Sequence, residues 1–454
     1  MMMEQVEQGE VKKDMKQPNF IVIYCDDLGY GDLGCYGSDT VKTPHLDELA
    51  EKGIRFTNWY SNSPVCSPSR ASLLTGKYPS RAGVGEILGA KRGSHGLPAD
   101  EVTLAKALKP AGYRTALYGK WHLGISEETS PNAHGFDEFF GFKAGCVDFY
   151  SHIFYWGQGH GVNPLHDLWE NETEVWENGR YMTELITERS VDFIKRSREQ
   201  DAPFFLFASY NAPHYPMHAP KEYMDRFAHL PWDRQVMAAM IAAVDDGVGE
   251  IVKALKDAGC YEDTVIFFSS DNGPSSESRN WLDGTEDIYY GGSAGIFRGH
   301  KASLFEGGIR EPAILSWPNG FDGGQVRDEV AAMMDIVPTF LDLAGVDPVA
   351  GGPLQGIAID GSSLKEMLIR GEPSPHKQLF WEYHGQLAVR EGNWKLVLNG
   401  KLDFDRVVPD EVHLSDLSKD PGERTNLAEH YPEIVERLSR GVQDWYEKVQ
   451  RHGS

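Results

Sequence analysis

One cysteine lies in a setting that favours chemical reactivity. Cys66 has a proline two residues away on either side, Pro64 and Pro68, so the chain there is expected to be extended or turning, and the residues from 72 onward indicate a helix. A thiol at the N-terminus of a helix, beside a cation such as Arg70, is expected to have a lowered pKa. From these residues alone, Cys66 is either a reactive thiolate or, like most single cysteines, a small buried apolar side chain.

Three carboxylates and an amide come directly after two short apolar runs; they are Asp26, Asp27, Asp271 and Asn272. Adjacent side chains on a strand point to opposite faces, so Asp26 and Asp27 converge only if the strand has ended. Neighbouring buried carboxylates repel each other, and a divalent cation removes that repulsion. A ligand set made only of oxygens indicates Ca²⁺ or Mg²⁺ rather than zinc. Taken alone, the Asp26-Asp27 pair is more often a solvated turn.

Three cations and two imidazoles are the remaining candidates. Arg70, Lys120 and Lys301 would bind an anion, and both lysines lie in apolar or glycine-rich runs where a solvated surface lysine is not expected. His122 and His214 each follow a predicted strand and are suited to acid or base chemistry near neutral pH. A lone histidine is more often structural, so these two depend on their neighbours.

A parallel sheet flanked by helices would bring these residues together. Five short, almost continuously apolar runs predict strands buried on both faces, at 20–24, 114–118, 204–208, 264–269 and 312–317. Helices are predicted at 44–52, 103–111, 182–198, 233–258, 334–343 and 432–450. Ligands bind at the carboxyl ends of the strands in open α/β sheets, and four of the predicted strands are followed there by candidate residues. The sequence therefore predicts a single site formed by residues at the carboxyl ends of four strands.

The composition and the predicted secondary structure change at two places along the chain. Residues 143–180 are rich in His, Trp, Tyr and Gly without periodicity, which indicates a long ordered loop that is either a substrate wall or an ordinary loop anchored by aromatic side chains. After about residue 370, short antiparallel strands are predicted at 379–383, 388–390 and 394–398, ahead of the terminal helix. We therefore expect a doubly wound α/β domain over 18–365 and a smaller α+β subdomain over 370–454.

Composition excludes some classes of protein. The 454 residues carry 44 Lys+Arg against 68 Asp+Glu, a formal net charge of −24, which argues against a nucleic-acid surface. The five cysteines are odd in number and include no CxxC pair, so neither a disulfide framework nor a zinc site is indicated. Neither a membrane span nor a secretory signal is recognisable, so we expect no membrane partner and a cytoplasmic location, or a periplasmic or secreted one if a signal peptide was removed.

The run from Cys66 to Gly76, CSPSRASLLTG, resembles without a departure the signature Cys-x-Pro-Ser-Arg-x-x-x-x-Thr-Gly of the type I sulfatases. The resemblance covers most of residues 18–430, and its general character is similar to that of the arylsulfatases and N-acetylgalactosamine-6-sulfatases. Other runs similar to those of the family, in the same order, are PNF with DDLG (18–29), GKWHLG (119–124), HGFD (134–137), APHYP (212–216), SDNG (270–273), GHK with EGGIREP (299–312) and LSDL with DP (414–421).

The resemblance implies an alkaline-phosphatase-like, doubly wound and mostly parallel sheet, and hydrolysis of sulfate monoesters of a carbohydrate or an aryl alcohol. It implies that a formylglycine-generating enzyme oxidises Cys66 to formylglycine, whose hydrate attacks sulfur. It also implies one Ca²⁺ ion bound by five residues, Asp26, Asp27, Asp271, Asn272 and the modified Cys66.

Roles for the other candidates also come from the resemblance. Arg70 and His122 hold the hydrate, and Lys120 binds a sulfate oxygen. His214, helped by Lys301, protonates the departing alcohol, and His122 then deprotonates the second hydroxyl so that sulfate is expelled. A plain Ser or Cys ester lacks that second hydroxyl, which is the chemical reason for the modification.

Two alternatives remain open at this point. The chain is also compatible with a phosphate or phosphonate monoester hydrolase of the same superfamily, which must stabilise more negative charge. It is compatible as well with a non-catalytic binder of sulfated glycans in which Cys66 stays a thiol.

Overall fold

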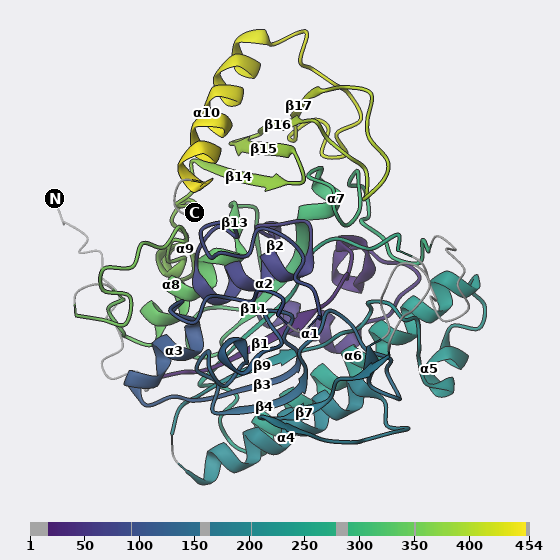
Figure 1. Ribbon diagram of the computed structural model, residues 1–454, viewed down its shortest axis with the longest axis vertical. Coiled ribbons are helices and arrows are strands. Elements are labelled where there is room, and N and C mark those ends of the chain that lie inside the picture. The colour runs from purple at the N-terminus through teal and green to yellow at the C-terminus, as the bar shows by residue number, and fades with distance from the viewer. Residues whose placement is uncertain are drawn as a thin grey trace, which may run out of the picture.

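A large, mostly parallel sheet forms the centre of the molecule (Figure 1). The computed structural model describes residues 17–91, 93–154, 164–200, 202–277, 289–348 and 351–450. Five neighbouring strands of the sheet run parallel, in the order β10 (Thr264–Ser270), β1 (Asn19–Cys25), β9 (Phe204–Ser209), β3 (Arg114–Lys120) and β4 (Glu138–Phe142). Four of these are predicted strands, and their carboxyl ends meet at one edge.

Both sides of this parallel core are extended by other strands. On one side, β11 (Arg310–Ser316) pairs antiparallel with β10, and β2 (Ile54–Tyr60) pairs antiparallel with β11. Next to β2 lie the short strands β12 (Gln325–Arg327) and β13 (Ala331–Ala332), while on the other side β7 (Trp169–Glu170) and β8 (Thr173–Glu174) extend β4. The run at 312–317 is thus a strand as predicted, but an antiparallel one.

Helices cover both faces of the sheet. Along β1, Ile21 and Ile23 belong to one buried cluster and Phe20 and Val22 to another, because successive side chains of a strand alternate between faces. The first cluster includes residues of α1 (Pro44–Glu51), α4 (Met182–Glu199) and α6 (Trp232–Asp257); the second includes residues of α2 (Cys66–Thr75), α3 (Leu104–Leu108) and α8 (Ile336–Leu343). The doubly wound arrangement is confirmed.

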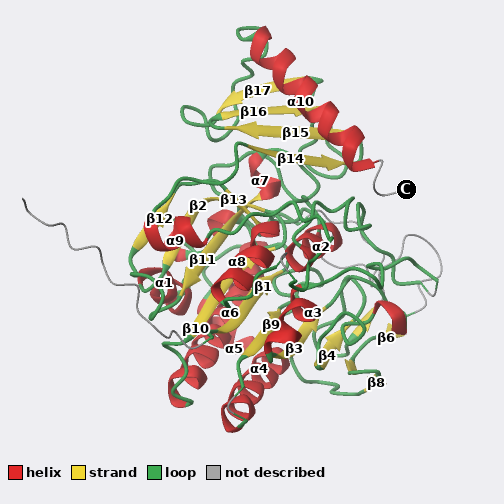
Figure 2. Cartoon of the chain, turned by 90° about the vertical axis from the view of Figure 1, so that its left-hand side faces the viewer, coloured by secondary structure: helices red, strands yellow, loops and turns green. Residues whose placement is uncertain are grey.

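A second, four-stranded antiparallel sheet is built from the C-terminal part of the chain (Figure 2). Its strands are β14 (Gln378–Tyr383), β15 (Gln386–Glu391), β16 (Trp394–Leu398) and β17 (Val412–Asp416). The terminal helix α10 (Pro432–Gln450) packs Leu438 and Val442 against this sheet. Three of the strands and the helix were predicted and β17 was not, while the domain boundaries at 365 and 370 stay predictions.

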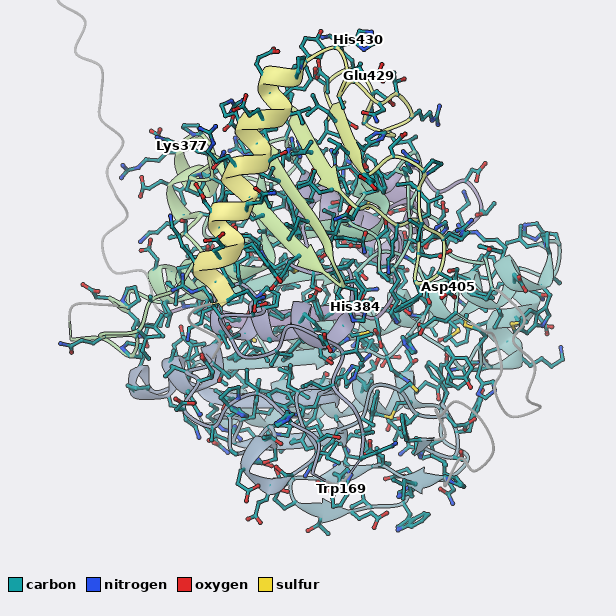
Figure 3. The ribbon with its side chains drawn as sticks, turned by 45° about the horizontal axis from the view of Figure 1, so that its top comes forward. Trp169, Lys377, His384, Asp405, Glu429 and His430 are labelled. Carbon is teal, nitrogen blue, oxygen red and sulfur yellow. The ribbon has the colours of Figure 1, made fainter. Side chains whose placement is uncertain are left out.

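The two sheets are in contact. Trp381 of β14 donates its indole N–H to the backbone oxygen of Ser61, 2.7 Å away, and packs against Tyr60 at the end of β2. The turn between β14 and β15, which carries His384, lies where the second sheet meets the rest of the molecule (Figure 3). The C-terminal subdomain therefore packs beside the carboxyl-end loops of the large sheet.

The segment 143–180 is not a plain loop. It contains β7 and β8 and a further pair of short strands, β5 (Ile153–Phe154) and β6 (Leu165–His166), while residues 155–163 lie outside the described part of the chain. In the part of the chain that the structure describes, the remaining elements are α5 (Lys221–Arg226), α7 (Glu306–Ile309), α9 (Lys365–Arg370) and the 3₁₀ turns η1 (Tyr30–Asp32), η2 (Gly34–Tyr36), η3 (Lys109–Ala111), η4 (Glu127–Thr129) and η5 (Met333–Asp335). Within the described ranges, no helix has both the length and the apolar character to cross a membrane. Cellular location stays a prediction.

Candidate active site

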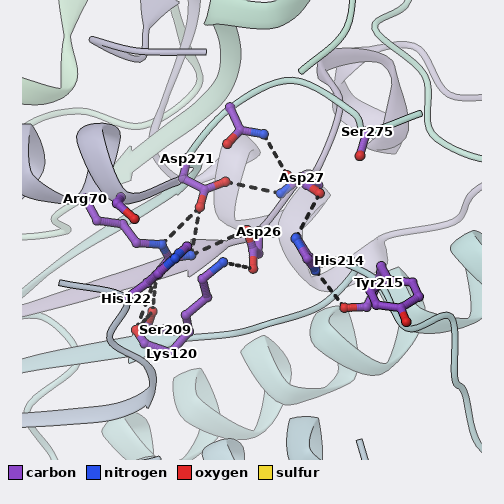
Figure 4. Close-up of polar contacts among 12 residues, drawn as sticks. Asp26, Asp27, Arg70, Lys120, His122, Ser209, His214, Tyr215, Asp271 and Ser275 are labelled. Carbon is purple, nitrogen blue, oxygen red and sulfur yellow. Dashed lines mark hydrogen bonds and ion pairs between the residues drawn. The ribbon is translucent and has the colours of Figure 1, made fainter. Parts of the chain in front are cut away.

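The predicted residues gather at the carboxyl ends of the parallel strands (Figure 4). Asp26 and Asp27 follow β1, Lys120 ends β3, and Asp271 follows β10. His214 lies in the loop after β9. Strands that run in the same direction end at the same edge, which explains how residues up to 245 positions apart come into contact.

Cys66 is the first residue of α2 and is buried. Its sulfur lies among the carboxylate oxygens of Asp26 and Asp27 and a ring nitrogen of His214, with all four atoms within 4.8 Å of one another. Burial raises the pKa of the thiol well above its usual value, although Lys120 acts in the opposite direction. The expected lowering of the Cys66 pKa is wrong, because the cost of burying a thiolate exceeds the attraction of the nearby cations.

Arg70 lies one helical turn after Cys66 and is held by several partners. Its Nε and Nη2 donate to the same oxygen, Oδ2 of Asp271, at 3.0 and 2.8 Å, and its Nη1 donates to the hydroxyl of Ser209 at 2.7 Å. A planar guanidinium that is bound at both edges has little rotational freedom. Arg70 is therefore a fixed positive charge at the edge of the site.

Lys120 forms a close ion pair with Asp26. Its Nζ lies 2.6 Å from Oδ2, and both side chains are fully buried. Burial acts to raise the pKa of Asp26, but Lys120 and then Arg70 outweigh it and hold that pKa below its usual value. Asp26 is thus an ionised carboxylate in the interior.

The carboxylates lack enough positive charge. Burial raises the pKa of Asp27 to about 8, with Asp26 adding to the effect and Lys301 opposing it. Asn272 donates from Nδ2 to Oδ1 of Asp27 at 2.7 Å. Oδ1 of Asp26 and Oδ1 of Asn272 are buried without a hydrogen-bond partner.

A divalent cation would bind the two unpartnered oxygens and would favour the ionised form of the neighbouring carboxyl whose pKa is raised. Asp26, Asp27, Asp271 and Asn272 therefore fit a hard, oxygen-loving metal ion. The sulfur of an unmodified Cys66 does not belong to such a set, whereas an oxygen in its place would.

Lys301 and His214 form a second charged group beside Asp27. Nζ of Lys301 lies 3.0 Å from Oδ2 of Asp27, 3.2 Å from Nε2 of His214 and 2.7 Å from Oε2 of Glu277. Nδ1 of His214 lies 2.6 Å from the backbone oxygen of Tyr215, so this nitrogen carries the ring proton and Nε2 is the acceptor. Burial, and then Lys301, lower the pKa of His214 well below its usual value, so the ring is neutral.

His122 is held in a strained backbone conformation, with φ at 56°. Its Nε2 lies 3.1 Å from the backbone oxygen of Leu88 and donates to it, which leaves Nδ1 unprotonated, buried and without a partner. A Cβ atom on Gly145 would come within 2.8 Å of the ring, so the ring is also confined by close contact. Burial, and then Lys120, lower the pKa of His122, so it is a neutral imidazole with a free acceptor.

Comparison with known proteins decides the family. The family model described as "Sulfatase" matches residues 18–346, and one described as "N-sulphoglucosamine sulphohydrolase, C-terminal" matches residues 292–448. The chain belongs to the sulfatase family. It is therefore a sulfuric ester hydrolase, as the sequence predicts.

Relatives of this sulfatase match nearly its whole length. Human arylsulfatase A is 34% identical over 478 residues, covering 94% of this chain and 87% of the human protein. Human N-acetylgalactosamine-6-sulfatase is 33% identical over 460 residues, covering 93% of this chain and 84% of the human protein.

Solved structures confirm the fold class. Ps i-CgsB, solved in complex with k-i-k-neocarrahexaose, superposes with a TM-score of 0.83 at 31% identity and covers 95% of this chain and 93% of its own. The phosphonate monoester hydrolase of Agrobacterium radiobacter superposes with a TM-score of 0.63 at 22% identity and covers 95% of this chain and 96% of its own, which is a likeness of fold alone. The alternatives of a phosphate or phosphonate hydrolase and of a non-catalytic glycan binder receive no support from these matches.

Two residues of the sulfatase site were not predicted. Ser209 is the last residue of β9, and the strand-end argument that found Lys120 would also have found it. Glu277 lies after β10 in a segment without periodicity or a recognisable motif, so no signal in the sequence pointed to it. All the predicted site residues lie in the same region, while their individual roles stay predictions.

Proposed function

We propose that this sulfatase hydrolyses the sulfate ester of a sulfated carbohydrate, using a nucleophile that a formylglycine-generating enzyme makes from Cys66. The observation that carries the proposal is the position of Cys66 Sγ within 4.8 Å of oxygens of Asp26 and Asp27 and a nitrogen of His214. Formylglycine, as its hydrate, supplies one hydroxyl for attack on sulfur and a second whose deprotonation expels sulfate. The raised pKa of the Cys66 thiol supports this need for modification, because an unmodified thiol there would stay protonated and inert.

Asp26, Asp27, Asp271 and Asn272 would hold Ca²⁺. The unpartnered oxygens of Asp26 and Asn272 and the raised pKa of Asp27 support a cation with oxygen ligands. Bound there, Ca²⁺ would supply positive charge that orients the nucleophilic hydroxyl and stabilises charge that develops on the sulfate oxygens.

The charge balance of the site supports sulfate over phosphate. Four carboxylates, those of Asp26, Asp27, Asp271 and Glu277, are in contact with three cations, Arg70, Lys120 and Lys301. A divalent cation leaves this group with a single positive charge. A sulfate monoester carries one negative charge and neutralises it, whereas a phosphate monoester dianion leaves a buried excess of negative charge.

The two histidines have different hydrogen-bonding states that suit different proton transfers. Nε2 of His214 shares a proton with the ammonium of Lys301, so the pair would supply a proton to the departing alcohol oxygen. Nδ1 of His122 is an unprotonated acceptor, so it would take the proton from the second hydroxyl. Lys120 and Arg70 would hold the sulfate oxygens during both steps.

Carbohydrate is the proposed substrate class because of what the relatives' names state. Ps i-CgsB was solved with a neocarrahexaose, and N-acetylgalactosamine-6-sulfatase is named for a sulfated amino sugar. A panel of defined sulfated mono- and disaccharides, with release of inorganic sulfate as the readout, tests this part of the proposal.

The reaction class is tested by comparing kcat/KM for nitrophenyl sulfate with kcat/KM for nitrophenyl phosphate. The protein should first be shown by peptide mass to contain formylglycine at position 66. We expect a clear preference for the sulfate ester. A preference for the phosphate ester would refute the proposal.

A further inference from the structure

Glu277 is an ionised carboxylate in the active site, and the proposed mechanism gives it no role. Its Oε2 lies 2.7 Å from Nζ of Lys301 and 3.9 Å from Nε2 of His214, the two groups that would meet the departing alcohol oxygen. Burial acts to raise the pKa of Glu277, but Lys301 and His214 outweigh it and lower the pKa to about 2. The side chain is therefore negatively charged at any pH at which the enzyme works, and it can only accept hydrogen bonds.

The carboxylate differs from its neighbours in exposure. Its side chain is 15% exposed, whereas those of Asp27 and Lys301 beside it are 1% and 2% exposed. Ser275 fixes its orientation, because the serine hydroxyl donates to Oε2 at 2.9 Å and accepts from the Glu277 backbone N–H at 3.0 Å. Among the described residues, the recorded hydrogen bonds to this carboxylate all use Oε2. Its second oxygen, Oε1, accepts none of these hydrogen bonds.

Glu277 is not needed to keep Lys301 positively charged. Asp27 already lies 3.0 Å from the Lys301 ammonium, and together with Glu277 it raises the Lys301 pKa well above its usual value. A purely structural counter-charge would also be expected to be as buried as Asp27. The partial exposure leaves the carboxylate accessible to a group on the substrate.

We propose that Glu277 is a specificity-determining residue whose Oε1 accepts a hydrogen bond from a hydroxyl group on the carbon next to the one that bears the sulfate ester. This inference rests on the proposed function, in which His214 and Lys301 meet the ester oxygen. On a sugar, the oxygen of a neighbouring hydroxyl lies roughly 3 Å from the ester oxygen, which is a hydrogen-bond length. A carboxylate as close to His214 and Lys301 as Glu277 is would therefore be within reach of that hydroxyl. The same charge repels a second sulfate at that neighbouring position, so the site selects a vicinal hydroxyl over a vicinal sulfate.

Two chromogenic probes isolate the contact, 2-hydroxy-5-nitrophenyl sulfate and 2-methoxy-5-nitrophenyl sulfate. They differ in whether the group next to the ester can donate a hydrogen bond. Their kcat/KM ratio is measured at a pH where the phenol keeps its proton, for the wild type, Glu277→Gln and Glu277→Ala. Glu86→Gln is the matched control, because Glu86 is exposed and its recorded ion pair, with His384, is a distant 4.0 Å.

We expect the wild type to favour the hydroxy probe and Glu277→Ala to lose about tenfold of that preference, as for a hydrogen bond to a charged group. Glu277→Gln, which keeps a neutral acceptor, should lose less, and Glu86→Gln should keep the wild-type ratio. Intrinsic differences in leaving-group reactivity cancel, since each variant is compared with the wild type on the same two probes.

An equal fall in kcat/KM for both probes in Glu277→Ala would overturn the proposal, because it would mean that Glu277 acts only through Lys301. Wild-type protein with verified formylglycine that releases sulfate from neither probe and from no saccharide of the panel would instead refute the proposed function. Melting temperature and formylglycine content, measured for each variant, distinguish these outcomes from misfolding.

Discussion

The molecule contains two buried clusters of charge that resemble each other in composition but differ in how they are paired. The active-site cluster consists of Asp26, Asp27, Asp271, Arg70, Lys120 and Lys301. The interface cluster, where the two sheets meet, consists of Tyr60, Glu306, Arg310, Arg390, Lys395 and Glu423. Each contains a lysine of 0% exposure, Lys120 in the first and Lys395 in the second, that is bound to carboxylates.

The interface cluster has three cations, Arg310, Arg390 and Lys395, for two carboxylates. Lys395 of β16 lies 2.8 Å from Oε1 of Glu306 and 3.3 Å from Oε1 of Glu423, while Arg310 lies 2.9 Å from Oε2 of Glu306. The hydroxyl of Tyr60 donates to Oε2 of Glu306 at 2.6 Å. Each carboxylate thus has a cation of its own cluster within 3.3 Å, although Oε1 of Glu423 accepts no hydrogen bond.

The active-site cluster has more carboxylates than cations once Glu277, which pairs with Lys301, is counted with it. Oδ1 of Asp26 has no hydrogen-bond partner and its nearest recorded cation, on Arg70, is 3.8 Å away. In both clusters burial raises the pKa of one carboxyl, Asp27 to about 8 and Glu423 to about 7, while nearby cations lower the pKa of another, Asp26 or Glu306. A buried cluster with more cations than carboxylates needs no added positive charge, whereas a cluster with more carboxylates than cations is completed by a bound cation.

The largest difference between the clusters should come from removing each buried lysine. Lys120→Met should lower kcat/KM for an aryl sulfate about a thousandfold, because a fixed charge that stabilises the transition state is lost. Its melting temperature with Ca²⁺ present should stay close to that of the wild type, since the metal ion still neutralises Asp26. A loss of less than about tenfold in kcat/KM would contradict a role for Lys120 in catalysis.

Lys395→Met is the matched change in the interface cluster. It leaves Glu306 and Glu423 without their shared cation, so we expect the free energy of unfolding to fall by about 3–5 kcal/mol. The fraction that remains folded should keep its kcat, because no residue of the active-site cluster is touched. Urea unfolding measures the first quantity; unchanged stability would show that the interface cluster does not hold the two sheets together.

The next largest difference should be in how the stability of variants in the two clusters depends on the metal ion. Ca²⁺ at about one hundred times its dissociation constant should add about 2.7 kcal/mol to the stability of the wild type and restore activity lost on chelation. Asp271→Asn should lose most of this thermal response, and Glu306→Gln, the control in the interface cluster, should keep it. Calcium-dependent melting that is the same in both variants would place the ion somewhere other than the active-site cluster.

The smallest expected effect concerns pH and the interface cluster. Burial raises the pKa of Glu423 from 4.5 to about 7, although Lys395 opposes it. A carboxyl that binds its proton more tightly when folded contributes stability that is complete below the unfolded pKa and is lost as the pH rises through the folded one. Between about pH 5 and about pH 8, the wild type should therefore lose on the order of 1 kcal/mol more stability than Glu423→Gln. Equal pH dependence in the two proteins would argue against this assignment.

The sequence predicted the active-site cluster better than the interface cluster for a physical reason. Parallel strands place their carboxyl ends together, so Asp26, Lys120 and Asp271 could be grouped once the strands were recognised. The interface cluster joins residues such as Tyr60 and Arg390, which are 330 positions apart and lie on different sheets. No periodicity links such residues, and only the packing of one sheet on the other brings them into contact.

Two errors at the site come from effects that a sequence does not contain. The pKa of Cys66 depends on how completely the thiol is buried, which outweighs the helix terminus and the nearby cations. Glu277 depends on the path of an irregular loop that returns to Lys301. By contrast, β2 could have been predicted, because its sequence IRFTNWY alternates apolar and polar residues over its first four positions as a half-buried strand does.

The central claim is that the nucleophile is made from Cys66, and it is tested most directly by relating activity to modification. Preparations made with and without a coexpressed formylglycine-generating enzyme are digested, and the fraction of the Cys66 peptide in which CH₂SH has become CHO is measured by mass. We predict that turnover of nitrophenyl sulfate is proportional to that fraction, passes through zero at no modification, and is absent in Cys66→Ala of unchanged melting temperature. Sustained turnover by protein in which every Cys66 is still a thiol would contradict the account.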